Sequence, residues 1–64
     1  MSGNMRPTIL RGASDMGWLQ RTHRAPAWTQ TAIVYGNEDA PTRIECWDHP
    51  KPLHNNPPRL TIWP

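Results

Sequence analysis

The chain has 64 residues, a formal net charge of +2 and a single cysteine. This length limits it to one small domain, residues 1–64, that buries only ~60% of its unfolded surface, and one cysteine excludes an internal disulfide. Nine leucine, isoleucine and valine residues and no phenylalanine leave few aliphatic side chains for a core, so four tryptophans must supply much of its apolar area. We therefore expect a marginally stable fold, or one that gains its order on binding.

The charges are segregated along the sequence. Residues 1–24 carry a net charge of +3, residues 25–49 a net −3, and residues 50–64 a net +2. These segments can neutralise one another within the fold, or the arginine-bearing first segment can contact phosphate. The sequence lacks both the ~18 consecutive apolar residues of a membrane span and the apolar run of a signal peptide. We expect no membrane partner and a location in the cytoplasm or within a virion.

The N-terminal part of the sequence predicts an arm and then a short extended segment. Residues 1–7 are mostly small and polar, and Pro7 biases the residue before it to an extended conformation, so we expect a flexible arm. Residues 8–11 end at Gly12 and favour an extended segment that can pair with the edge of a sheet.

Residues 14–23 are the one stretch that favours a helix. Ser14 is suited to the N-cap, Asp15 falls in the first turn, and basic residues gather near the far end, a polarity that suits the helix dipole. We expect a helix of two turns or an ordered loop, with Trp18 and Leu19 facing the sheet.

A β-hairpin is predicted at the centre of the chain. Residues 31–35 are mostly β-branched or aromatic, and residues 42–47 alternate, with Ile44 and Cys46 on one face and Trp47 on the other. The residues between them include glycine, asparagine, aspartate and proline, which are typical of turns. The length of this connection favours a bulge or a wider turn over a tight primed turn.

A third strand is predicted at residues 59–63, after a proline-rich stretch. Residues 48–58 contain four prolines, which excludes a helix or a central strand and favours an extended connection. The expected fold is small and β-rich (α+β at most): a three-stranded antiparallel sheet, one short helix or ordered loop, and extended Pro-rich arms. The predicted core residues are Ile33, Tyr35, Ile44, Cys46, Leu60, Ile62, Trp18 and Leu19.

Tryptophan and arginine residues are the candidates for a contact surface. If Ile44 and Cys46 face the core, Trp47 faces outward beside Arg43, and an exposed tryptophan flanked by charges is typical of a contact site. Tryptophan and arginine together suit a protein interface or a surface that stacks bases and binds phosphate. Alternatively, the tryptophans pack only in the core. The predicted partner-binding residues are Trp47, Arg43, Trp63, Arg59 and Trp28.

One group of side chains has the chemistry of a metal site. Cys46 and His49 are separated by two residues, His54 follows after four more, and His23 lies upstream. A thiolate and neutral imidazoles are ligands that Zn²⁺ prefers. The paired cysteines of zinc fingers are absent, and the alternative is a buried cysteine with exposed loop histidines. We expect no cofactor, with zinc as the alternative.

The sequence does not indicate an enzyme. A chain this small can hardly enclose a pocket of ~300 Å³ with supporting residues around it, and no glycine-rich phosphate loop or catalytic triad is evident. The leading hypothesis is a non-catalytic protein-binding component, accessory or structural, of a larger protein assembly, for example in a virus. The alternatives are a small nucleic-acid-binding module and a zinc-stabilised mini-domain.

Overall fold

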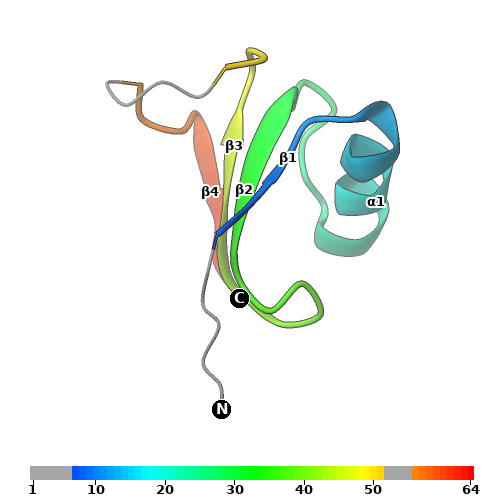
Figure 1. Ribbon diagram of the computed structural model, residues 1–64, viewed down its shortest axis with the longest axis vertical. Helices are drawn as coiled ribbons and strands as arrows, with labels where there is room; N and C mark the ends of the chain where they lie inside the picture. The colour runs from blue at the N-terminus through cyan, green and yellow to red at the C-terminus, as the bar shows by residue number, and fades with distance from the viewer. Residues whose placement is uncertain (1–6, 52–55) are drawn as a thin grey trace.

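Four strands and one helix form the part of the chain described by the structure, a computed structural model that covers residues 7–51 and 56–64 (Figure 1). The elements are β1 (Thr8–Leu10), α1 (Ala13–His23), β2 (Thr31–Gly36), β3 (Pro41–Trp47) and β4 (Leu60–Ile62). The strands form one antiparallel sheet in the order β1-β2-β3-β4.

The predicted class, a small β-rich fold with an antiparallel sheet and one helix, is confirmed. The sheet has four strands instead of three, because β1 pairs with β2 and becomes an edge of the sheet. The strand predicted at residues 59–63 is shorter than expected, since only β4 within it pairs with β3. The arm predicted at residues 1–7 lies outside the described residues except for Pro7.

Helix α1 is longer than the two turns expected, with 11 residues. It begins after Gly12, whose extended backbone makes it the N-cap without a side-chain hydrogen bond, so the predicted cap Ser14 lies inside the first turn. It ends at Arg24, which adopts the left-handed conformation with φ of 60°, and the Ala25 N–H donates to the Leu19 carbonyl at 3.2 Å. This hydrogen bond pairs the first amide after the cap with a carbonyl group near the end of the helix.

The hairpin turn contains the irregularity that its length predicts. The register between β2 and β3 shifts between Tyr35 and Gly36, and Gly36 has a positive φ of 87°. Asn37 accepts a hydrogen bond from the Asp39 N–H through its side-chain oxygen (3.2 Å), and its carbonyl accepts one from the Ala40 N–H (3.1 Å). Asparagine favours such turns because its side chain can replace a backbone acceptor.

One face of the sheet carries the core. Val34 pairs with Ile44 across the hairpin and Ala32 pairs with Cys46, and all four are buried. Side chains from α1 complete this core, so we call this side the helix face, and the predictions for Leu19, Ile44 and Cys46 are confirmed. The core residues are Leu10, Met16, Leu19, Ala25, Ala32, Val34, Ile44 and Cys46, with Trp18, Trp28 and Ile62 packed against them.

The opposite side, which we call the open face, contains two residues that the sequence assigns to the core. Ile33 pairs with Glu45 instead of facing Ile44, and Tyr35 lies on the same side as Ile33; both are half-buried. The prediction for these two residues is wrong, because a shift of one residue in the register moves every side chain of a strand to the other face.

Candidate functional site

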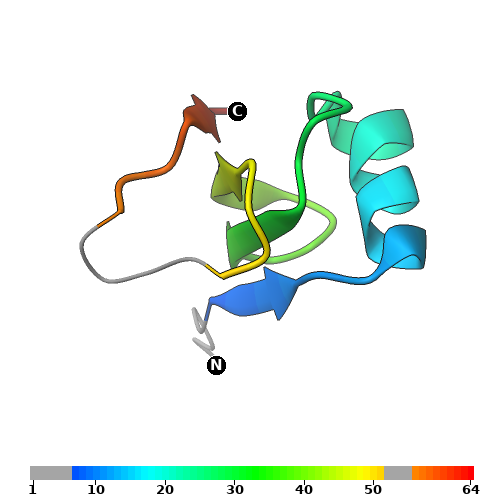
Figure 2. The same cartoon turned by 90° about the horizontal axis from the view of Figure 1, so that it is seen from above.

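An open pocket lies on the helix face between three parts of the chain. Its walls come from the end of α1, from the hairpin, and from β4 with the residues after it. In Figure 2, α1 and β4 stand at opposite sides of the molecule. The pocket has a volume of about 470 Å³. Its lining residues are His23, Asp39, Ala40, Pro41, Thr42, Ile44, Ile62, Trp63 and Pro64.

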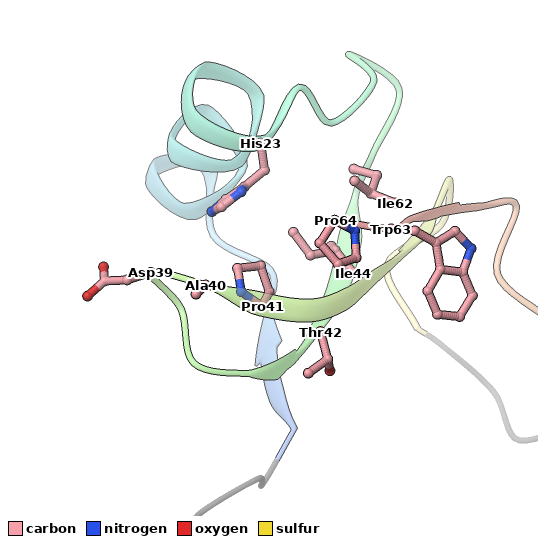
Figure 3. Close-up of a pocket in the computed structure, with 9 residues that line it drawn as sticks. All are labelled: His23, Asp39, Ala40, Pro41, Thr42, Ile44, Ile62, Trp63 and Pro64. Atoms are coloured by element: carbon pink, nitrogen blue, oxygen red, sulfur yellow. The ribbon is translucent and has the colours of Figure 1, made fainter.

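The floor of the pocket is apolar and its walls come from separate elements. Ile44 of β3 is almost completely buried at the base, and Ile62 of β4 lies next to it in the register. His23 reaches from the end of α1 towards Ala40 and Pro41 at the start of β3 (Figure 3). The pocket therefore forms only when α1, the hairpin and β4 come together.

The histidine in the wall is held by its neighbour on the helix. The rings of Trp18 and His23 meet edge to face, with centroids 5.1 Å apart and an interplanar angle of 75°. Trp18 itself packs against the core. Because the helix is anchored by the buried Leu19, this contact fixes the direction in which His23 projects.

Trp63 is the most exposed large apolar side chain among the described residues, with 67% of its surface accessible. It lies at one end of the pocket, and Figure 3 shows its indole directed away from His23. Leu60, which the sequence assigns to the core, is 40% exposed because β4 is an edge strand beyond the reach of α1. The predicted role of Trp63 in binding a partner stays a prediction.

Trp47 is not exposed, and the prediction of its exposure is wrong. Its side chain leaves the sheet on the open face, as the alternation predicts, but only 5% of its surface is accessible. Two described residues that follow β3, His49 and Asn56, bond to this part of the open face. The Trp47 indole N–H donates to the Asn56 carbonyl at 3.0 Å, and the buried Thr31 hydroxyl donates to the His49 carbonyl at 2.9 Å. The described part of the proline-rich connection thus extends the core onto the open face.

A charged cluster also lies on the open face. The Tyr35 hydroxyl donates to the Glu45 carboxylate at 3.0 Å, Arg43 Nε donates to the same carboxylate at 3.2 Å, and the guanidinium lies 3.8 Å from the centre of the Tyr35 ring. Burial and the hydrogen bond to Glu45 raise the pKa of the Tyr35 hydroxyl above 10.0. Arg43, predicted to bind a partner, therefore already has an internal anion.

Arg59 and Trp28 form a second cation–aromatic contact. The Arg59 guanidinium lies 4.5 Å from the centre of the Trp28 ring and makes an ion pair with Asp48 at 3.0 Å. The five residues predicted to bind a partner thus fall into three groups. Arg43 and Trp47 belong to the open face, Arg59 and Trp28 contact each other, and only Trp63 lines the pocket.

The predicted metal ligands occupy different surroundings. Cys46 is fully buried in the core, where burial raises the pKa of its thiol and the neighbouring Thr29 hydroxyl opposes this shift. His23 belongs to the pocket wall, and His49 Nε2 lies 3.3 Å from the side-chain nitrogen of Asn56. Within residues 7–51 and 56–64, no three histidine, cysteine or acidic side chains converge as a metal site. His54 lies outside these residues.

Comparisons with protein-family models, curated proteins and solved structures find no match to this chain. No helix in the described part of the chain has the length and apolar character needed to cross a bilayer.

Sequence reasoning identified Trp63 but missed the pocket beside it. The sequence predicts a turn around Ala40 and Pro41 and a core position for Ile62, and neither feature indicates a pocket. The available signal was the exposed tryptophan next to a short edge strand, since such a strand leaves part of a sheet face uncovered.

Proposed function

We propose that this protein is a non-catalytic binding module that attaches to a larger protein through the pocket and Trp63. One observation carries this proposal: the most exposed large apolar side chain of the described residues borders a pocket of about 470 Å³ with an apolar floor. Exposed apolar surface of this kind marks interaction sites, and tryptophan is among the residues that contribute most to binding energy at protein interfaces.

The two arginine–aromatic contacts, Arg43 with Tyr35 and Arg59 with Trp28, favour a protein partner over a nucleic acid. Arg43 and Arg59 are each bound to a carboxylate and stacked on an aromatic ring, so a phosphate would have to compete with an internal anion. A base-stacking surface also needs an exposed aromatic platform beside free cations. Trp63 is exposed, but the pocket that it borders contains no arginine or lysine.

Photo-crosslinking in the native host tests the proposal. The photoreactive residue p-benzoylphenylalanine is placed at Trp63 in one variant and at Gln20 in a control, because Gln20 is exposed on α1 and does not line the pocket. We expect a discrete crosslinked protein from the Trp63 variant that the Gln20 variant does not give. Crosslinking from neither position, or equally from both, would refute this binding surface.

A further inference from the structure

We infer that the pocket accepts a polypeptide segment in which a large apolar side chain is flanked by a lysine or arginine. This inference rests on the proposed function and defines the chemistry of the partner. The apolar side chain would contact Ile44 and Ile62, and the cation would lie near Asp39. Both parts follow from the composition of the pocket and from the charges of the described chain.

The apolar part of the partner is indicated by the pocket itself. Six of its nine lining residues are alanine, proline, isoleucine or tryptophan. The volume of about 470 Å³ is in the range of sites that bind small ligands, ~300–1,000 Å³. The pocket is open on one side, which suits a side chain that projects from another polypeptide.

The charged part of the partner is indicated by the acidic residues that the fold leaves unpaired. Glu45 and Asp48 form ion pairs with arginines, and Asp15 lies in the first turn of α1, where the helix dipole stabilises a carboxylate. Glu38 and Asp39, at the tip of the hairpin, have neither kind of partner among the described residues. The acidic charge available to a ligand is therefore concentrated at this tip.

The geometry fixes the order of the two contacts. Figure 3 shows the Asp39 carboxylate at one end of the pocket, directed outward, and Trp63 at the other end. Ile44 and Ile62 lie between these two residues. A segment lying across the pocket would therefore place its cation over the hairpin tip and its apolar side chain over the isoleucines, within reach of the indole.

Two adjacent carboxylates provide a matched pair of variants. Asp39 lines the pocket, whereas its neighbour Glu38 faces a different hollow beside α1. Asp39→Asn and Glu38→Gln remove the same charge and preserve side-chain size. If the partner's cation pairs directly with Asp39, D39N should lose two- to fivefold in affinity, because an exposed ion pair contributes about this much to binding. E38Q should lose less. Salt should reduce this difference.

The apolar contact is tested by filling the pocket. Ala40 is exposed in the hairpin loop and lines the pocket, so Ala40→Phe would occupy the pocket without disturbing the buried core. We expect A40F to weaken binding by about ten- to a hundredfold, because the partner's apolar side chain would stay in water. Circular dichroism must show an unchanged fold for this comparison.

The probe is a displayed library of random linear peptides selected on the immobilised full-length chain. Enriched peptides that combine a large apolar residue with a lysine or arginine, and that lose affinity on D39N and A40F as stated, support the inference. Enriched peptides without a basic residue, or equal binding to D39N and the unaltered chain, would overturn it. The absence of any enriched peptide would also overturn the inference, whether or not sedimentation shows that the chain associates with itself. The crosslink at Trp63 decides the proposed function independently.

Discussion

Trp47 and Trp63 provide the sharpest test of which tryptophans hold the fold together. Trp47 is 5% exposed and its indole N–H donates to the Asn56 carbonyl, whereas Trp63 is 67% exposed. The same substitution to phenylalanine at both positions removes the same atoms from opposite environments. We therefore expect Trp47→Phe to lower the free energy of unfolding and Trp63→Phe to leave it nearly unchanged.

The expected decrease in the free energy of unfolding of Trp47→Phe has two parts. The lost hydrogen bond accounts for about 0.5–1.5 kcal/mol, towards the lower value because Asn56 is exposed and water can replace the indole. The smaller ring leaves part of the site unfilled, which brings the total to about 1–2 kcal/mol. The exposed substitution W63F should stay within about 0.5 kcal/mol of the unaltered protein. Trp47→Ala would cost about 3–5 kcal/mol, as much as the core of so small a chain supplies.

Urea unfolding followed by far-ultraviolet circular dichroism measures both variants without relying on tryptophan fluorescence. With a slope of about 1 kcal/mol per molar urea, W47F should lower the midpoint by about 1–2 M. The slope itself should be the same in all variants if unfolding exposes the same surface. Equal midpoints for W47F and W63F would show that the proline-rich connection does not cover Trp47 in solution, and the reasoning would fail.

Three further predictions concern the turn, the open face and the cysteine. Gly36→Ala should destabilise the fold by about 1–2 kcal/mol in the same urea assay, because φ is 87° and the added methyl would approach the Thr42 nitrogen at 3.1 Å. The Tyr35 hydroxyl should titrate above its ordinary pKa of 10.0 when followed by ultraviolet absorbance, and Glu45→Gln should reduce this shift. Because the folded state favours the neutral hydroxyl, Tyr35 stabilises the fold fully below pH 10.0. This contribution disappears as the pH rises above that value. Cys46 should react with a disulfide reagent only as fast as the chain opens, since burial both shields the thiol and raises its pKa; rapid reaction without urea would contradict this burial.

The hairpin could be predicted from the sequence because its signals are local. Alternation over residues 42–47 and the β-branched run over 31–35 each require only one strand, and the turn residues lie between them. The helix was likewise indicated by its charge polarity. These features depend on neighbours within a few positions, which a sequence displays directly.

The face on which each β2 side chain lies depends on how β2 pairs with β3. The alternation of β3 places Ile44 and Cys46 on one face, but only the register decides whether Ile33 or Val34 joins them. The bulge between Tyr35 and Gly36 changes this register by one residue. A sequence signals that a bulge is present without stating where it falls, so the core of β2 was assigned to the wrong side.

The pocket could not be predicted because no segment contains it. Its lining combines the end of α1, the hairpin loop and the end of β4, which become neighbours only in the folded chain. Trp47 illustrates the reverse case, since a tryptophan on the uncovered face was reasonably expected to be exposed. Its indole N–H bonds to the Asn56 carbonyl, which follows it by nine positions, and the sequence of the proline-rich connection gives no sign of this contact.

The difference in exposure between Trp47 and Trp63 also bears on function. A chain with so few aliphatic residues needs its aromatic side chains for stability, and Trp18, Trp28 and Trp47 all pack against other parts of the fold. Trp63 does not, although burying a tryptophan would remove ~150–250 Å² from water. A small protein gains nothing in stability from leaving that surface exposed. If W63F preserves the urea midpoint while substitution at Trp63 abolishes binding, the exposed indole serves the partner and not the fold.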